Sequence, residues 1–192
     1  MKNVCIVGNS PCILRKEKGR AIDSFPEIVR FGKAPLSEYE KYVGTKTTHR
    51  FLNRVTLYNK SENHGENQSI VPSLKDLIIY HDDDSKPDFT IFHKSIQFRK
   101  INRVKEFENM IKKYFSGLDT ANIKPTGGLA MISYYLNRKY SVNIIGFGLL
   151  ENLKSKIIPH YYENKRNQTS HNYNFEIRTV ISLIEEKKIK IL

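Results

Sequence analysis

Long apolar stretches are missing from this 192-residue chain. No run approaches the ~20 consecutive apolar residues of a membrane-spanning helix. The N-terminus, MKNVCIVGNSPCIL, has one lysine and a short apolar run that Gly8 and Asn9 interrupt. It therefore predicts a first strand and not a signal peptide. We expect a cytoplasmic protein with neither a signal peptide nor a transmembrane segment.

Cysteine is scarce as well, since Cys5 and Cys12 are the only two. Two cysteines cannot build a disulfide framework, which favours a reducing compartment. The sequence also lacks zinc-ligand spacing, internal repeats and any recognisable nucleic-acid-binding motif. With 39% hydrophobic residues, it predicts one globular domain that can bury a real core.

Acidic residues are too few to balance the basic ones. The chain has 20 Asp and Glu against 32 Lys and Arg, a formal net charge of +12. Such an excess fits an anionic partner: a nucleic acid, an acidic membrane surface or a phosphorylated substrate. The basic residues are scattered and form no single block, so charge alone leaves these alternatives open.

The segment from Pro125 to Gly148, PTGGLAMISYYLNRKYSVNIIGFG, is the most informative part of what is present. A Pro-Thr-Gly-Gly turn precedes a predicted helix with one apolar face, formed by Leu129, Ile132, Tyr135 and Leu136. Glycines before a helix leave backbone N–H groups free to hold an anion. The pattern is equally typical of an ordinary loop, helix and strand.

Further strands and helices are predicted along the chain. We expect strands at Val4–Val7, Ile28–Phe31, Leu77–Tyr80, Phe89–Phe92 and Val142–Ile145, helices at Arg103–Phe115 and from about Phe175, and Arg138 and Lys139 in the last turn of the helix after Gly128. Polar segments are expected as a connector at 44–50, an exposed loop at 59–69 and a solvated end at 185–190. This alternation predicts an α/β fold, Rossmann-like, with a mostly parallel sheet flanked by helices.

Two short polar segments could serve a ligand or only a turn. In such sheets ligands bind beyond the carboxyl ends of the strands, where Asn9 and Ser10 follow the first strand. Their side chains could bond a ribose, base or phosphate, or stabilise their own backbone. Asp82, Asp83 and Asp84 could hold a divalent metal, but clustered aspartates more often solvate a loop.

Two histidines follow the glycine-rich region. His160 begins the segment His-Tyr-Tyr-Glu, and His171 lies eleven positions later, before the last predicted helix. Imidazole has a pKa near neutrality and can act as a general base. A lone histidine is more often structural, but two such residues downstream of a phosphate-type turn suggest a site.

Four motifs, in order, resemble those of the sialyltransferases of glycosyltransferase family 29. The segments CIVGNSP, AID, VRFGKAP and YVGTKTTHRFLN resemble the large sialyl motif, and the segment from Pro125 to Gly148 is similar to the small motif. HYYE resembles the third motif, and His171 with Glu176 five positions later matches the very small motif. The stretch from about 55 to 123 carries no part of the resemblance.

Several positions depart from the family pattern. Family members usually have Asn where Gly32 stands, and Pro26 replaces an acidic residue. Lys139 occupies the position of a cysteine that forms a disulfide in animal members. The anchor and stem of the Golgi enzymes are missing, which favours a short bacterial or viral member in a reducing cytosol.

The resemblance implies a glycosyltransferase type-A variant fold and one catalytic domain over residues 1–192. The donor would be CMP-sialic acid, transferred with inversion and without a metal or other cofactor to a sugar hydroxyl on a glycan. The acceptor would end in galactose or N-acetylgalactosamine, as on a glycoprotein, lipooligosaccharide or capsule. A basic surface could associate with the inner face of an acidic membrane, and no nucleic-acid partner is expected.

The resemblance also implies roles for individual residues. His171 would be the general base and His160 would stabilise the leaving phosphate, with Glu176 supporting the site. Donor and nucleotide binding would fall to Gly8, Asn9, Ser10, Thr126, Gly127, Gly128, Phe147, Gly148, Tyr161 and Tyr162. Three alternatives stay open: transfer of another CMP-linked acidic sugar such as Kdo, nucleotide binding by an inactive relative, and nucleic-acid binding.

Overall fold

The computed structural model describes residues 1–32, 34–52, 77–81, 97–115, 117, 123–149, 160–162 and 173–192. The described strands are β1 (Asn3–Val7), β2 (Glu27–Phe31), β3 (His49–Leu52), β4 (Leu77–His81), β5 (Phe98–Ile101), β6 (Ser141–Ile145) and β7 (Ile189–Ile191). The described helices are the 3-10 helix η1 (Pro11–Arg15) and the α-helices α1 (Gly19–Asp23), α2 (Glu40–Val43), α4 (Arg103–Tyr114), α5 (Gly127–Asn137) and α7 (Tyr173–Glu185).

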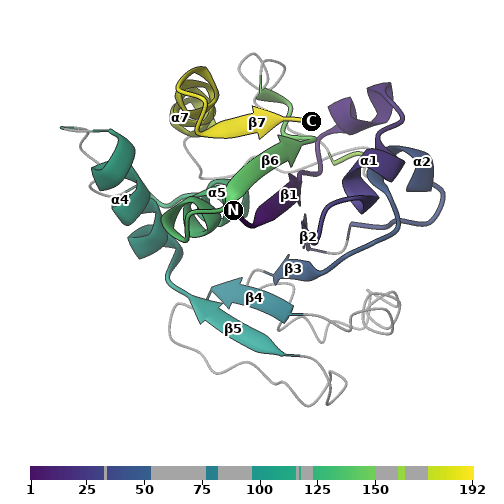
Figure 1. The fold of residues 1–192 in the computed structure, drawn as a ribbon, viewed down its shortest axis with the longest axis horizontal. Coiled ribbons are helices and arrows are strands. Elements are labelled where there is room, and N and C mark those ends of the chain that lie inside the picture. Colours follow the sequence, from purple (N-terminus) through teal and green to yellow (C-terminus); the bar gives the residue numbers. More distant parts are fainter. Residues whose placement is uncertain are drawn as a thin grey trace.

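The strands form one seven-stranded sheet with the order β5-β4-β3-β2-β1-β6-β7. All of its described pairings are parallel, which confirms the predicted α/β, Rossmann-like class. The chain runs outward from β1 to β5 and then returns to β6 on the other side of β1 (Figure 1). This reversal creates a topological switch point between β1 and β6, where open α/β sheets bind ligands.

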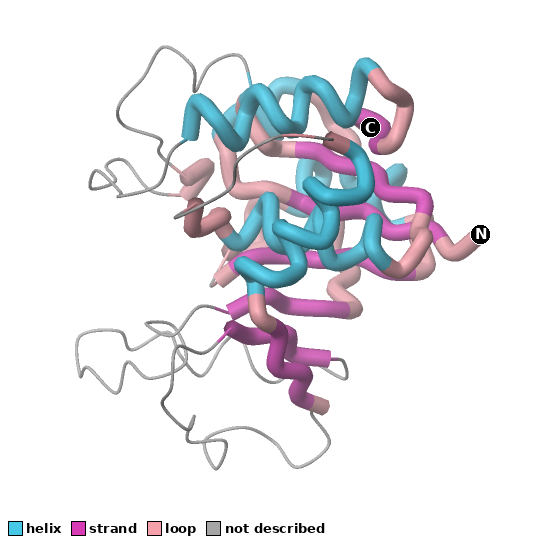
Figure 2. Tube along the Cα trace, turned by 90° about the vertical axis from the view of Figure 1, so that its left-hand side faces the viewer, coloured by secondary structure: helices cyan, strands magenta, loops and turns pink. Residues whose placement is uncertain are grey.

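Helices cover both faces of the sheet, so its central strands are buried on both sides. Alternate residues of β1 show this: Val4 and Ile6 pack into the core that also holds side chains of α4, α5 and α7. Cys5 and Val7 belong to the opposite core, with residues of η1, α1 and α2. In Figure 2 the strands lie side by side through the molecule with the helices around them.

Helix α5 differs from its sequence-based prediction in burial. The eight residues from Leu129 to Leu136 are all buried, so the helix has no exposed stripe. It packs on β1 and β6 and also against α4. The predicted apolar positions are buried as expected, and the other sides of the helix are buried too, because a central helix is enclosed on every side. Arg138 is the residue just beyond the helix, and Lys139 follows with φ 60°, so neither lies in its last turn.

Two segments predicted as polar contain the first residues of strands. His49 and Arg50 belong to β3, and Arg50 is buried, although the segment 44–50 was predicted to be a connector. The predicted solvated end contains Ile189, which is buried at the start of β7. Parallel pairing with β2 and with β6 supplies the backbone partners that override the polar sequence.

The remaining predicted strands at Val4–Val7, Ile28–Phe31, Leu77–Tyr80 and Val142–Ile145 are confirmed, as is the helix beginning at Arg103. The predicted strand at 89–92, the loop at 59–69 and the aspartates at 82–84 lie outside the described residues. Within the described part of the chain, none of the helices combines the length and apolarity needed to span a bilayer.

Candidate active site

The turns after β1 and β6 touch each other through their backbones at the switch point. Val7 pairs with Ile145 in register, and the Gly8 N–H donates to the Ile145 carbonyl at 2.7 Å. The Ser10 N–H donates to the Gly146 carbonyl at 2.8 Å. A Cβ on Gly8 would lie 2.4 Å from the Gly146 oxygen, so this approach requires glycine.

The N-terminus of α5 packs beside these turns. A Cβ on Gly127 would lie 2.6 Å from Cε1 of Phe51, and one on Gly128 would lie 3.0 Å from Cε1 of Phe147. Thr126 caps the helix, and its hydroxyl accepts from the Leu129 N–H at 3.3 Å. The first N–H groups of a helix have no intrahelical acceptor and carry its positive dipole end. The Thr-Gly-Gly turn therefore brings anion-binding chemistry next to Phe147.

The segment from His160 to Tyr162 lies against the turn that contains Asn9. The Tyr161 N–H donates to the Asn9 carbonyl at 2.8 Å, and Asn9 Nδ2 donates to the Tyr162 hydroxyl at 3.4 Å. The His160 and Tyr162 rings lie with their centroids 5.0 Å apart. The structure thus brings together residues from opposite ends of the sequence that were predicted to share one site.

Two of the predicted ligand contacts are used internally. Tyr161 is buried, its hydroxyl donates to the Pro35 carbonyl, and burial raises its pKa to about 12. Ser10 is also buried, and its hydroxyl caps η1 by accepting from the Cys12 N–H at 3.5 Å. Asn9, Tyr162 and His160 are half-buried and better placed to meet a ligand.

Glu176 connects the last helix to the Thr-Gly-Gly turn. Its carboxylate accepts from the Thr126 N–H at 2.8 Å and from the Thr126 hydroxyl at 2.5 Å. Burial raises the Glu176 pKa to about 7, while the bonds from Thr126 and the charge of Arg103 oppose that shift. Arg103 also donates to the Pro125 carbonyl at 3.1 Å. The start of α7 is therefore fixed to the start of α5.

The remaining residues singled out from the sequence are a glycine, a phenylalanine, a histidine and the two cysteines. Gly148 is buried with φ 58°, and Phe147 is half-buried with its ring 6.5 Å from that of Phe31. His171 lies outside the described residues. Cys5 and Cys12 are both free thiols. Among the described side chains, no group of three or more His, Cys, Asp and Glu could hold a metal ion.

Sequence reasoning missed four contributors near this edge of the sheet. Phe31 and Phe51 enclose the Thr-Gly-Gly turn, and Arg30 and Arg50 are buried on β2 and β3. Their position within strands was the available signal, because a charged residue in a buried parallel strand needs an explanation. For Arg50 that signal was hidden when its segment was predicted to be a connector.

Known proteins are similar to this chain in sequence and in fold. Residues 1–188 match the family described as "Glycosyltransferase family 29 (sialyltransferase)". The chicken (Gallus gallus) CMP-N-acetylneuraminate-beta-galactosamide-alpha-2,3-sialyltransferase 1 is 29% identical over 202 residues, covering 98% of this chain and 57% of the relative. The human beta-galactoside alpha-2,6-sialyltransferase 2 is 32% identical over 125 residues, covering 59% of this chain and 23% of the relative.

A solved structure agrees with this fold. A mammalian sialyltransferase crystallised with Gal-beta-1-3GalNAc-ortho-nitrophenol has a TM-score of 0.68 and 19% identity, covering 100% of this chain and 69% of the other. The two relatives in the preceding comparison come from vertebrates and do not support the bacterial or viral source expected from the sequence. The chain spans between about a quarter and three fifths of the length of those relatives. Because the family match covers nearly every residue, the chain belongs to glycosyltransferase family 29, the sialyltransferases.

Proposed function

We propose that this protein transfers sialic acid from CMP-sialic acid to a sugar hydroxyl of a glycan, with inversion and without a metal. The observation that carries the proposal is the meeting of three turns at the β1–β6 switch point. These turns follow β1, follow β6 and precede α5, and they come from the segments that match the family. We also propose that residues 1–192 act as one catalytic domain.

The nucleotide of the donor would lie against the turns at Gly8–Ser10 and Phe147–Gly148. The half-buried Asn9 offers an amide to the ribose or base. The half-buried ring of Phe147 offers an apolar surface beside the N-terminus of α5. That terminus would face the CMP phosphate, because unpaired N–H groups and the helix dipole both favour an anion.

Departure of CMP places negative charge on its phosphate as the bond to the anomeric carbon breaks. His160 and the Tyr162 hydroxyl would stabilise this charge as hydrogen-bond donors. Their neighbouring rings and the bond from Asn9 to Tyr162 support this assignment. Tyr161 would hold the segment in place, since its own hydroxyl is already used on Pro35.

The acceptor hydroxyl must lose its proton as its oxygen attacks the anomeric carbon. His171 would take that proton as the general base, a role that typically contributes ~10²–10⁴-fold to a rate. This residue lies two positions before the first residue of α7, whose Glu176 is fixed to Thr126. Glu176 would therefore hold the base and the phosphate-binding helix in one arrangement, without taking part in proton transfer.

The names of the relatives suggest the donor and the acceptor, and the net charge of the chain suggests where the protein works. The names of the two relatives specify a galactoside and a galactosamide, so we propose an acceptor that ends in galactose or N-acetylgalactosamine. The donor is proposed from the CMP-N-acetylneuraminate in the name of the chicken relative. The charge of +12 supports peripheral association with an acidic membrane surface on the cytoplasmic side.

Product analysis tests the function directly. The protein is incubated with CMP-sialic acid and a panel of galactose- and N-acetylgalactosamine-terminated glycans, and CMP release is measured with the mass of each product. A glycan heavier by one sialic acid is expected. CMP-Kdo is offered in parallel. Transfer of Kdo without transfer of sialic acid would show that the donor is CMP-Kdo and not CMP-sialic acid.

Nucleotide binding distinguishes the proposed transferase from a nucleic-acid-binding protein. Calorimetry should show tighter binding of CMP than of AMP, GMP or UMP. Equal or absent affinity for CMP would contradict the proposed donor. A nucleic-acid-binding protein would instead bind DNA or RNA with an affinity that falls steeply as salt increases.

A further inference from the structure

Two arginines lie side by side inside the protein, close to the proposed nucleotide site. Arg30 of β2 and Arg50 of β3 are partners in the parallel register. Their exposed fractions are 2% and 4%, so both guanidinium groups are removed from water. Burial of two neighbouring cations is costly unless other groups compensate for their charge.

The compensation visible in the structure comes from backbone oxygens and a hydroxyl. Arg30 donates to the carbonyls of Val43 and Lys46 at 2.6 and 2.9 Å, and to the Thr47 hydroxyl at 3.0 Å. Arg50 donates to the Gly32 carbonyl at 2.7 Å and more weakly to the Ala34 carbonyl at 3.4 Å.

Carboxylates take little part in this arrangement. Within the part of the chain that the structure describes, no carboxylate makes an ion pair with either arginine. Asp23 acts on Arg30 only as a neighbouring charge, and its oxygens accept from the N–H groups of Thr45 and Lys46. The hydrogen-bond acceptors that the structure shows for the two guanidinium groups are therefore uncharged.

Arg50 is linked to the proposed nucleotide site through the backbone that follows β2. Burial and the charge of Arg30 lower the pKa of Arg50 to about 10, and the neighbouring Tyr161 and Tyr162 oppose that shift. Those two tyrosines contact Asn9 through its carbonyl and its amide. Arg50 also holds the carbonyl of Gly32, one residue beyond the Phe31 carbonyl to which Asn9 Nδ2 donates at 3.5 Å. The buried charge thus lies next to the turn that would receive the donor.

We infer that the Arg30–Arg50 pair is a specificity device, which makes the Asn9 turn prefer a nucleotide that carries phosphate over the uncharged nucleoside. The inference rests on the proposed CMP site. Arg50 acts here as a positioning residue and as a fixed positive charge, without touching the reacting atoms. A buried charge is screened less by salt than an exposed one, so the preference persists at physiological ionic strength.

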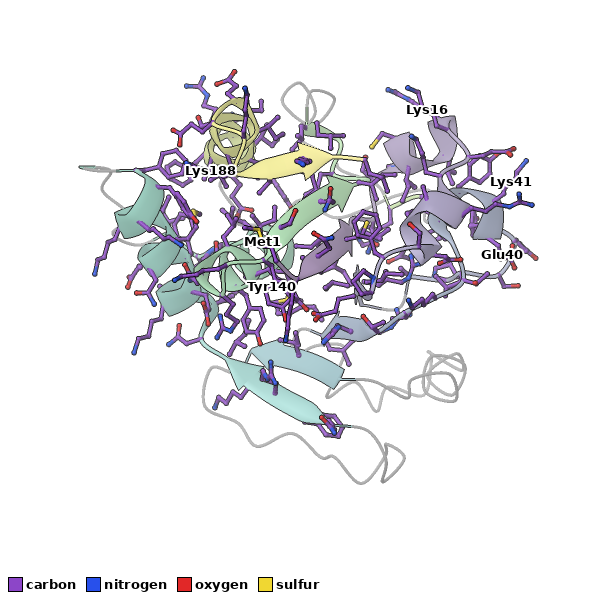
Figure 3. All side chains as sticks on the ribbon, in the orientation of Figure 1. Met1, Lys16, Glu40, Lys41, Tyr140 and Lys188 are labelled. Atoms are coloured by element: carbon purple, nitrogen blue, oxygen red, sulfur yellow. The ribbon has the colours of Figure 1, made fainter. Side chains whose placement is uncertain are left out.

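The test compares the affinities for CMP and cytidine, measured by calorimetry on the full chain. Arg50→Gln and Arg50→Met both remove the charge. Met also keeps much of the side-chain volume, and it is included because proteins often tolerate an apolar replacement of a buried ion. Arg50→Lys keeps the charge. Lys16→Gln is the matched control, since it removes one exposed charge at the outer margin of the molecule (Figure 3).

A unit charge acting over roughly 10 Å at an effective dielectric constant of about 20 changes the affinity for an ion by about tenfold. We expect the two neutral variants to lose about that factor for CMP and to keep the affinity for cytidine. Arg50→Lys and Lys16→Gln should keep the original ratio of the two affinities.

Three results would overturn the inference. The folded neutral variants could keep the CMP-to-cytidine ratio, they could lose both ligands equally, or Arg50→Lys could lose the ratio as they do. Equal loss would assign Arg50 a structural role alone. Failure of the unmodified protein to bind CMP is a separate result, because it contradicts the proposed function before any variant is compared.

Discussion

The two ends of α5 are each held by a glutamate from another helix, but the two glutamates are used differently. At the N-terminal end, Glu176 of α7 accepts from the backbone and hydroxyl of Thr126. At the C-terminal end, Glu106 of α4 accepts from Asn137 at 2.8 Å and pairs with Arg138 at 2.9 Å. Arg138 also lies over the Tyr134 ring, 3.6 Å from its centroid.

The difference lies in burial and in the partner. Glu176 is buried and bonds to uncharged donors, whereas Glu106 has a full cationic partner, Arg138, whose side chain is 41% exposed. A carboxylate paired with a partly exposed arginine mainly joins two helices. A buried carboxylate that accepts from the capping Thr126 fixes the start of the helix whose free N–H groups would bind phosphate. We therefore expect the N-terminal end of α5 to position groups that bind the donor, and the C-terminal end to serve packing alone.

Replacing His171 should have the largest effect on turnover, and a histidine that packs against α5 provides the control. His171→Ala should reduce turnover by roughly two to four orders of magnitude, because it removes the proposed base, and leave CMP affinity nearly unchanged. The matched control is His49→Ala. The His49 ring packs against Tyr135 of α5 with centroids 6.3 Å apart, and its Nδ1 lies 2.8 Å from the Thr48 hydroxyl.

The control should keep the turnover of each folded molecule. Melting temperature, CMP affinity and turnover are measured for both variants. A stable His171→Ala protein with near-normal turnover would remove His171 as the base. Parallel losses of stability and turnover in the two variants would indicate that both histidines are structural.

The same substitution at the two glutamates tests whether the two ends of α5 differ in function. Glu176→Gln loses the charge-assisted bond from the Thr126 hydroxyl, and a misplaced phosphate-binding terminus can cost about 10²-fold in turnover. Glu106→Gln should leave turnover unchanged and cost about 1 kcal/mol or less of stability, because its partner is partly exposed. Turnover and denaturant unfolding are compared for both. Equal effects on turnover would show that the two ends do not differ in function.

Stability against pH offers a subtler contrast. The folded pKa of Glu176 is about 7, above its ordinary value of 4.5, so between these values the folded protein keeps a proton that the unfolded chain releases. The contribution of Glu176 to the free energy of unfolding must therefore fall as pH rises through this window. Across this window, wild type should lose up to about 3 kcal/mol of unfolding free energy relative to Glu176→Gln. Parallel stability curves would mean that Glu176 titrates normally.

The ends of α5 also show what sequence could predict. The pattern of Val4–Val7, Val142–Ile145 and the glycine-rich turns predicted the parallel sheet and the segments that meet at its edge. Those segments follow directly from strand ends, and a local pattern determines where a strand ends. The parallel order then brings the turns together, as observed in the bond from the Ser10 N–H to the Gly146 carbonyl.

Sequence reasoning failed where long-range contacts decide the role of a side chain. Nothing near Tyr161 in the sequence indicates that its hydroxyl would bond to Pro35, 126 positions away. Arg50 was hidden in a polar segment, because its burial depends on pairing with β2 and not on its neighbours in sequence. Glu176 was predicted to support the site, but its bonds to Thr126 could be seen only in three dimensions.

The smallest expected effect concerns metal. The proposal assigns the phosphate charge to the N-terminus of α5, to His160 and to Tyr162, which together supply the positive field that a divalent cation would otherwise provide. Turnover should therefore be the same with EDTA as with added magnesium or manganese. Gel-filtered protein is assayed under each condition, with CMP release as the measurement. Loss of turnover in EDTA, restored by either cation, would show that the field at this end of α5 is insufficient and would make Asp82–Asp84 the first candidate ligands.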